Sequence, residues 1–401
     1  MPTTPRRLVR LVPLVLVLAL LAAACGEEGE DGQETTEPTG EPTQAAPIRI
    51  GLLTYLSGPF VSFGSDIQAA VNLAVDEINA AGGVNGSILE IVVFDSPGEP
   101  EQAVLGTRQL AEDGAVAIIG PVSSGEAEVA FTETGPLEVP MITGTANKEG
   151  ITELGGGWAF RNTATNTQLY QVVMPAYTQA YGVTRVALAY DEQEPFAVAA
   201  AQFALPAVAG ELGVEIADTV TFQRGQTDFT ALVQRLGEAD VEGVFVMGGP
   251  VESGLLSAEM GRQGLDLPVM GHVAHNSSAF RESSGGSIGD WVVPSLFYAP
   301  MAGEKGQAFA EAMSGLDQEP PTVPEAANYY DIVYMIAGIL SDAGMDGSTD
   351  LVEARHAIRD GLLALSGFDG AAGPTSFLEN GDALKQIYSL LLNMEGADLL
   401  G

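Results

Sequence analysis

Residues 48–83 read IRIGLLTYLSGPFVSFGSDIQAAVNLAVDEINAAGG, and they contain the first strand-to-helix unit from which the fold class is predicted. The apolar run 48–53 predicts a buried strand, and residues 55–64 predict a loop that contains a Gly-Pro pair. From Ile67 to Ile78 apolar residues recur at helical spacing. The stretch therefore predicts a strand, a loop and a helix in that order.

The two ends of this helix carry their own signals. Ser65, with Gln68 three residues later, fits a capping box and predicts the first turn. Gly82 and Gly83 predict the C-terminal cap.

The same alternation continues along the chain. Further strands are predicted at 89–94, 116–119, 139–143, 186–190, 214–220, 244–247, 268–271 and 291–293, and helices at 102–113, 195–209, 229–236, 324–341 and 351–365. Short apolar strands that alternate with helices predict parallel sheets covered on both faces. The body has roughly 350 residues, which exceeds the size at which a single hydrophobic core is usually sufficient. We therefore expect an α/β fold with two doubly wound parallel-sheet lobes.

The N-terminus has the pattern of a secretory leader. Arg6, Arg7 and Arg10 precede an apolar run at 11–24, which is followed by Cys25, the only cysteine. The run is shorter than the ~20 residues of a membrane span and fits a signal peptide that ends at a lipidation site. The alternative is an uncleaved anchor with an incidental cysteine.

The segment after Cys25 is polar and acidic. Residues 26–47 have no apolar periodicity and are rich in Glu, Gly, Thr and Pro, which predicts a disordered tether. If Cys25 carries the lipid, no thiol remains for a disulfide, a metal site or a nucleophile.

The charge of the chain excludes one class of partner. There are 16 Lys and Arg against 53 Asp and Glu, a formal net charge of −37. Nucleic acids and anionic lipid surfaces both require basic patches. We expect no nucleic-acid partner, and contact with the membrane through the lipid anchor only.

Two predicted strand-to-helix turns carry polar side chains. Residues 119–126 place Ser123 and Ser124 at a helix N-terminus, where free N–H groups and two hydroxyls suit a carboxylate or another acceptor-rich group. The alternative is that one serine is simply the N-cap. Residues 141–147 form a second turn of the same kind, with the same ambiguity. In open α/β sheets ligands bind at such turns.

At these residues the chain resembles a known family. The motifs are Ile50-Gly51, Leu56-Ser57-Gly58-Pro59, Asp76-Glu77-Ile78-Asn79, Gly82-Gly83-Val84-Asn85-Gly86, Ile119-Gly120 with Ser123-Ser124, Thr227-Asp228-Phe229-Thr230, Tyr330-Asp331, and Gly373-Pro374 with Asn380-Gly381-Asp382. In their order and spacing over about 48–395 they resemble the type I periplasmic solute-binding proteins of ABC importers, in the leucine/isoleucine/valine-binding branch.

The resemblance implies how the lobes are built. Lobe 1 would hold 48–164 and 298–374, and lobe 2 would hold 165–297 and 375–401. Three hinge crossings would lie near 162–165, 296–298 and Thr375. The ligand would bind between the lobes, which would close around it.

The resemblance also implies a set of ligand contacts. The carboxylate contact falls on Ser124, beside Ser123, and the ammonium contacts fall on the carbonyl of Thr145 and on Asn147. An aromatic wall falls on Phe63. Two positions that are tyrosines in the family fall at Phe196 and Pro250.

One family contact is missing. The acid that neutralises an amino acid's ammonium group falls near Val273, and residues 271–276 contain no acid. A buried ammonium group without a countercharge is costly, so a carboxylic acid, an amide or a urea-like ligand becomes comparably consistent with the sequence. We hypothesise that His272 or His275 replaces the missing contact.

Other motifs support neither catalysis nor a metal site. His272 and His275 have the spacing of metal ligands but fall in a predicted loop with no cysteine nearby. Residues 285–289 match G-x-S-x-G, but a loop precedes the serine and a strand follows it. No P-loop motif occurs, so ATP would be used by another subunit. We expect no cofactor, no metal and no enzymatic activity.

The implied function is that of an extracytoplasmic, monomeric receptor that works with a permease and an ATPase of an ABC importer and takes a small solute. The alternative is a ligand-sensing lobe pair that signals to a membrane partner. Such a sensor usually continues into a transmembrane helix and an output domain. The sequence ends at Gly401 without them, which favours the importer.

Overall fold

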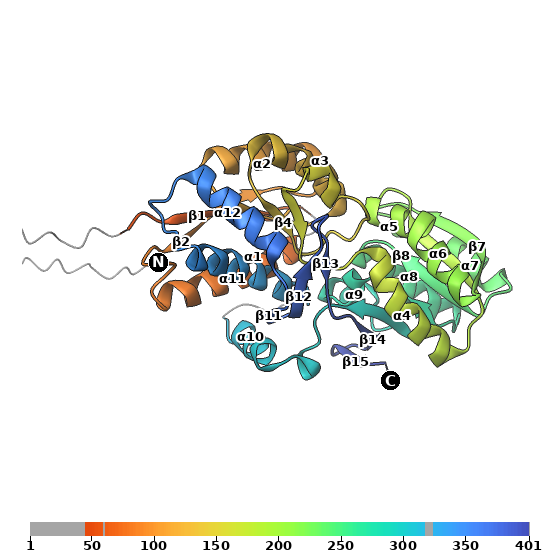
Figure 1. Cartoon of the computed structure of the whole chain (residues 1–401). Coiled ribbons are helices and arrows are strands. Elements are labelled where there is room, and N and C mark those ends of the chain that lie inside the picture. Colours follow the sequence, from red (N-terminus) through yellow and green to blue (C-terminus); the bar gives the residue numbers. More distant parts are fainter. Residues whose placement is uncertain (1–44, 59–60, 317–323, 401) are drawn as a thin grey trace, which may run out of the picture. The chain divides into compact units, whose positions relative to one another are not determined.

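The structure is a computed structural model that describes residues 45–58, 61–316 and 324–400. Residues 44–401 form one compact unit in which strands alternate with helices (Figure 1). Cys25, the predicted signal peptide and most of the predicted tether lie outside the described residues. The lipidation site therefore stays a prediction.

The first sheet has five parallel strands with helices on both faces. In spatial order the strands are β2 (Leu89–Asp95), β1 (Ile48–Thr54), β3 (Ala117–Ile119), β4 (Met141–Thr143) and β5 (Ala159–Arg161). One face carries α1 (Val61–Ala80), α11 (Ala326–Asp342) and α12 (Leu351–Ala364), and the other carries α2 (Pro100–Glu112) and α3 (Ser124–Leu137). Ile50 and Leu52 pack on the first face and Leu53 on the second, as the two-residue period of a strand requires.

The second sheet is larger and mixed. Its order is β15 (Ala397–Leu399), β14 (Tyr388–Leu392), β10 (Trp291–Ser295), β9 (Val269–Met270), β8 (Gly243–Met247), β6 (Arg185–Asp191) and β7 (Glu215–Phe222). Strands β6 to β10 run parallel, and β14 and β15 add antiparallel strands at one edge. We call the first sheet with its helices lobe 1 and the second sheet with its helices lobe 2.

Helices also cover both faces of the second sheet (Figure 1). One face carries α4 (Asn166–Tyr181), α5 (Pro195–Ala199) and α6 (Leu205–Leu212), and the other carries α7 (Thr230–Glu238), α8 (Pro250–Gln263) and α9 (Ser278–Ser283). The two doubly wound lobes predicted from the sequence are confirmed.

Helix α1 begins earlier than the sequence predicts. The helix starts at Val61, and the hydroxyl of Ser65 donates to the carbonyl of Val61 at 2.9 Å inside the first turns. Ser65 is therefore not an N-cap, and the predicted capping box is wrong. The predicted end is confirmed, because the N–H of Gly83, with φ +74°, donates to the carbonyl of Ile78 after the last turn.

The stretch Pro195–Leu212 is the one part of the described chain with the length and composition of a membrane-crossing helix. It consists of α5, a π-helical segment (Ala200–Ala204) and α6. Ala197, Leu205 and Val208 pack in the core of lobe 2, so the helix has the contacts of a core helix in a globular lobe.

A small antiparallel sheet lies beside lobe 1. It contains β11 (Phe368–Gly370), β12 (Gly373–Phe377) and β13 (Ala383–Leu384), and α10 (Glu304–Ser314) precedes it in the chain. Phe377 packs edge-on against Phe160 of β5, with 5.7 Å between ring centroids, and Ala383 lies in the same core. We therefore propose that the third connection between the lobes lies at residues 385–387, after β13 rather than near Thr375.

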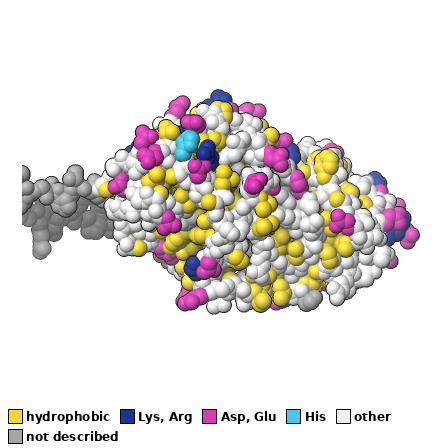
Figure 2. Space-filling model, viewed as in Figure 1, with side chains coloured by type: hydrophobic (Ala, Val, Ile, Leu, Met, Phe, Trp, Pro, Cys, Tyr) yellow, Lys and Arg dark blue, Asp and Glu magenta, His cyan; other side chains and the backbone are white. Residues whose placement is uncertain are grey.

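The visible face of the folded body carries many acidic side chains. Asp and Glu side chains are scattered over it and Lys and Arg are fewer (Figure 2), as expected for a chain with a net charge of −37. No broad basic surface appears on this face.

Candidate functional site

A cavity of about 100 Å³ lies at the carboxyl ends of strands from both large sheets. Most of its lining residues follow β1 to β4 in lobe 1 and β6 to β9 in lobe 2, and Glu325 precedes α11. A single water occupies ~10–15 Å³ of such space, so the cavity has room for a small solute. Its position is the one at which open α/β sheets bind ligands.

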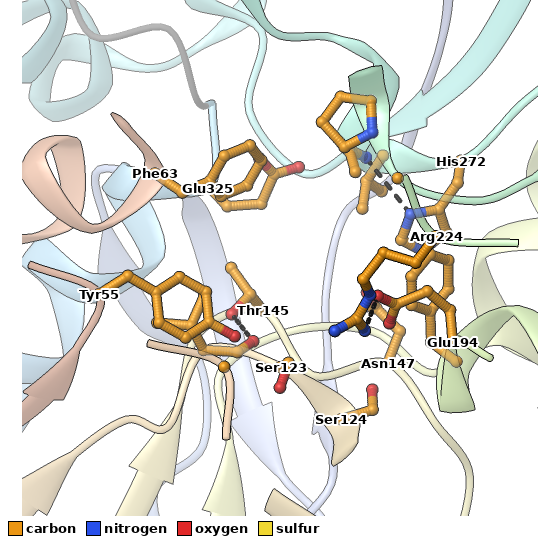
Figure 3. Close-up of a pocket in the computed structure, with 17 residues that line it drawn as sticks. Tyr55, Phe63, Ser123, Ser124, Thr145, Asn147, Glu194, Arg224, His272 and Glu325 are labelled. Atoms are coloured by element: carbon orange, nitrogen blue, oxygen red, sulfur yellow. Dashed lines mark hydrogen bonds and ion pairs between the residues drawn. The ribbon is translucent and has the colours of Figure 1, made fainter. Parts of the chain in front are cut away.

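All the predicted ligand-binding residues except His275 line this cavity. They are Phe63, Ser123, Ser124, Thr145, Asn147, Phe196, Pro250 and His272. Figure 3 shows the serines, Thr145 and Asn147 along one side of the cavity, with Tyr55 and Phe63 on a second side and Arg224, Glu194 and His272 opposite them.

The turn between β3 and α3 presents Ser124 to the cavity. The turn begins at Gly120, whose φ is +116°; a Cβ there would lie 2.2 Å from the carbonyl oxygen of Leu53. Ser123 is the N-cap of α3, and its Oγ accepts from the N–H of Glu126 at 3.3 Å while Glu126 accepts from the N–H of Ser123. The capping role considered for one serine therefore belongs to Ser123. Ser124 Oγ accepts from the N–H of Lys148 at 3.2 Å, which leaves its hydroxyl hydrogen for a ligand.

The side chain of Glu126 stabilises this turn through hydrogen bonds. It is buried and accepts hydrogen bonds from the hydroxyls of Ser96 and Ser123. Desolvation raises the pKa of the Glu126 carboxyl, and the hydrogen bonds from these hydroxyls oppose that shift. The hydroxyl of Ser123 is thus already used within the protein.

The turn after β4 offers acceptors. Thr145 Oγ1 lies 2.7 Å from the hydroxyl of Tyr329. The side-chain NH₂ of Asn147 donates to Thr163 Oγ1 at 3.1 Å and to the carbonyl of Ala164 at 2.6 Å. Since both amide hydrogens are used, the Oδ1 acceptor of Asn147 is the atom left for a ligand.

The histidines of lobe 2 have different roles. His272 lines the cavity and stacks on Phe196, with 4.4 Å between ring centroids. Its Nδ1 accepts from the N–H of Ala274, which places the proton of the neutral ring on Nε2. Burial lowers the pKa of His272 well below its usual value, so the ring is neutral near pH 7.

His275 lies behind the cavity wall. Its Nδ1 accepts from the N–H of His272 at 3.0 Å, and its Nε2 lies 3.1 Å from the carbonyl of Gly248. The side chain is fully buried, and desolvation lowers its pKa to about 4. Both ring nitrogens contact backbone atoms, so the geometry does not favour the predicted contact between His275 and the ligand. The His275 side chain instead fixes the backbone at His272.

An ion pair that the sequence reasoning missed lines the same wall. Arg224 follows β7 and pairs with Glu194, the residue before α5 (Figure 3). Desolvation raises the pKa of Glu194, and the charge of Arg224 opposes this shift. Both residues follow the carboxyl ends of predicted strands, so a search of every strand end for charged side chains would have found them.

A second missed group is Glu325, next to the start of α11. Its side chain lines the cavity, and the residue is 2% exposed. Neither carboxylate oxygen has a hydrogen-bond partner among the described residues. Desolvation raises the pKa of Glu325 to about 7. Glu325 stands at a helix start, outside the strand-to-helix turns in which the sequence predicts polar ligand contacts.

The turn after β9 presents Val273 and Ala274 to the cavity and no carboxylate. The carboxylates that line the cavity come from Glu194 and Glu325. The turn near Val273 therefore supplies no acidic side chain, but other segments supply carboxylates to the cavity.

Comparisons with known proteins agree with this geometry. Residues 47–394 match the family model described as periplasmic binding protein. The leucine-, isoleucine-, valine-, threonine- and alanine-binding protein of Pseudomonas aeruginosa is 27% identical over 335 residues, which cover 84% of this chain and 87% of the relative.

Solved structures give the same result. The branched-chain amino acid transporter substrate binding protein LivJ from Streptococcus pneumoniae, in complex with isoleucine, has a TM-score of 0.79 at 26% identity and covers 88% of this chain and 98% of its own. A solute binding protein of an ABC transporter from R. palustris, in complex with benzoate, has a TM-score of 0.78 at 18% identity, with 89% and 96% covered. At 18% identity, the similarity to the benzoate-bound protein shows a shared fold.

Proposed function

This chain belongs to the periplasmic binding protein family, and we propose that it is the extracytoplasmic solute receptor of an ABC importer. It captures a small polar solute between its two lobes and delivers it to a membrane permease. The observation that carries the proposal is the cavity at the strand ends, which both lobes line and which contains hydroxyl, amide and aromatic groups together.

The chemistry of the cavity supports a solute with an acceptor-rich end, such as a branched-chain amino acid or a related carboxylate or amide. The carboxylate binds at Ser124, where the hydroxyl donates and the first N–H groups of α3 are directed at the anion. Phe63 and Phe196 cover the apolar part of the solute. The relatives named for branched-chain amino acids support this class.

Delivery requires the lobes to close on the solute and open again at the permease. We propose that the connections at 162–165, 296–298 and 385–387 carry this hinge motion. A separate ATPase subunit drives transport, and the receptor acts as a monomer held to the membrane by a lipid on Cys25, a residue outside the described part of the chain.

The test is a thermal-shift screen with branched-chain amino acids, aromatic acids, amides and urea. A ligand at 100 times its Kd stabilises the protein by about 2.7 kcal/mol. Ser124→Ala should weaken binding of the best ligand by about tenfold or more, because a hydrogen bond to a charged group contributes ~1.5–3 kcal/mol.

The matched control is Ser341→Ala, at an exposed position near the end of α11, which should leave affinity unchanged. A flat response of the unsubstituted protein across the whole panel would contradict the solute-receptor proposal. If Ser124→Ala binds the ligand as tightly as the unsubstituted protein, the Ser124 hydroxyl does not contact the ligand.

A further inference from the structure

Glu325 is a buried carboxylate whose two oxygens have no hydrogen-bond partner on any other described residue. It lies at the N-terminus of α11, yet its side chain accepts no capping hydrogen bond from the first turn of that helix. Both oxygens are enclosed and lack hydrogen-bond partners within the described residues, and the side chain lines the cavity.

Such a group is expensive to keep. Burying an unpaired carboxylate costs several kcal/mol, and native proteins leave few buried polar atoms without partners. The N-terminus of α11 offsets part of the cost through its dipole, but supplies no hydrogen bond to the side chain. A positively charged group on a bound ligand would supply the missing partner.

The other carboxylate of the cavity does not need such a partner. Glu194 is already paired with Arg224, so its charge is compensated within the protein. His272 is neutral, and its Nε2–H has no hydrogen-bond partner among the described residues, so it is available to donate to a ligand. Glu325 is thus the cavity carboxylate without a countercharge among the described residues.

We propose that Glu325 is the countercharge for a cationic nitrogen of the solute, and that it makes the receptor select solutes with such a nitrogen as well as a carboxylate. This inference rests on the proposed function. The sequence lacks the family's acidic contact to the ammonium group near Val273 in lobe 2. The proposal assigns that contact to Glu325 in lobe 1, at the start of α11.

The position of α11 makes both contacts possible for one small molecule. Tyr329 lies four residues after Glu325, about 6 Å along the helix, and its hydroxyl contacts Thr145 Oγ1 at 2.7 Å. Asn328 donates from Nδ2 to the carbonyl of Gly144 at 2.9 Å and ties the same turn to the β4 loop. The helix start is therefore fixed against the turn that carries Thr145 and Asn147, next to Ser124.

The protonation of Glu325 suits this role. Its pKa of about 7 leaves the carboxyl partly protonated near neutral pH without a ligand. A cationic nitrogen placed beside it would favour the ionised form, so the charge develops when its partner is present.

Matched pairs of probes test the proposal by titration calorimetry. One pair is L-isoleucine and 3-methylpentanoate, and the other is L-phenylalanine and 3-phenylpropanoate; within each pair only the amino group differs. We expect the unsubstituted protein to bind the amino member at least tenfold more tightly, and Glu325→Gln to lose at least tenfold of that preference.

Two controls separate binding from folding. Glu77→Gln alters a carboxylate that accepts from Tyr330 and Tyr334 of the same helix but does not line the cavity, and it should keep the preference unchanged. The thermal midpoint of Glu325→Gln without ligand at pH 8 should equal or exceed that of the unsubstituted protein, which excludes misfolding as the cause.

The outcomes are distinct. If Glu325→Gln keeps the preference, or weakens both members of a pair equally, the inference is overturned and the proposed function stands. Tighter or equal binding of the acids that lack nitrogen by the unsubstituted protein also overturns the inference. No binding of either pair would count against the proposed function itself, and with it this inference.

Discussion

At the residue scale, the cavity separates side chains that the fold already uses from side chains that remain available. Ser123 caps α3 and His275 supports the backbone of His272, although the sequence made both look like ligand contacts. Ser124 and Glu325 keep unused hydrogen-bonding capacity. Residue type and spacing locate such groups. The bonds of Ser123 to Glu126 and of His275 to the His272 N–H are local, whereas the contacts of Ser124 with Lys148 and of His275 with Gly248 depend on segments distant in the sequence.

Glu325 gives a prediction about stability and pH. Its pKa is raised from 4.5 to about 7 in the folded protein, so between these values the folded state holds a proton that the unfolded state has lost. Stability therefore falls as pH rises from about 4.5 to about 7. Glu325→Gln lacks the titrating carboxyl and should therefore be more stable than the unsubstituted protein at pH 8, by roughly 3 kcal/mol, and equal to it near pH 4.

Urea unfolding of both proteins at pH 4, 6 and 8 measures this difference, and other titrating groups cancel because both proteins contain them. A Glu325→Gln variant that is less stable at pH 8 would show that the carboxylate has a stabilising partner in the ligand-free protein. The expected gain in stability with a loss of ligand selectivity is typical of a binding residue.

At the element scale, the β4 turn is held by a buried arginine. Arg161, at the end of β5, donates to the carbonyls of Ala146 and Lys148 at 3.1 and 2.8 Å and pairs with Asp382 at 2.6 Å. Its side chain is fully buried. These contacts flank Thr145 and Asn147, so the arginine fixes the shape of the turn that faces the ligand.

Arg161→Met should destabilise the protein by about 3–5 kcal/mol, because it leaves the buried carboxylate of Asp382 without its countercharge. Equilibrium urea unfolding measures the change. The control is Arg108→Met, which breaks an ion pair with Glu133 whose arginine is more than half exposed. It should change the stability far less than Arg161→Met, because exposed ion pairs contribute little. Similar losses for both variants would contradict the structural role given to Arg161.

Most elements could be predicted because their cause is local. Continuous apolar runs identify the buried parallel strands, and the helical period identifies α1, α2 and α11. The start of α1 could not be predicted, because Ser65 bonds back to Val61 inside the helix instead of capping it. Helices α4 and α8 were not assigned from the sequence, and α4 has a proline in its interior, which weakens the local signal.

At the scale of the whole molecule, the two lobes bring together turns that are distant in sequence. Ser124 and Glu325 are about 200 residues apart and line one cavity. The resemblance of the sequence to a family predicted Phe63, Ser124, Asn147 and most other wall residues. It could not predict Glu325 or the Arg224–Glu194 pair, because these occupy positions that the matching motifs do not include.

The central claim is that one small solute binds in this cavity. Ala274 lines its lobe 2 wall and is partly buried, and Ala274→Trp would fill the space with an indole. The most direct measurement is calorimetric titration of the best ligand from the screen into both proteins, with far-UV circular dichroism to confirm folding.

We expect one binding site per chain in the unsubstituted protein and no measurable binding in a folded Ala274→Trp variant. Unchanged affinity in that folded variant would show that the ligand binds elsewhere and that this cavity is not the solute site.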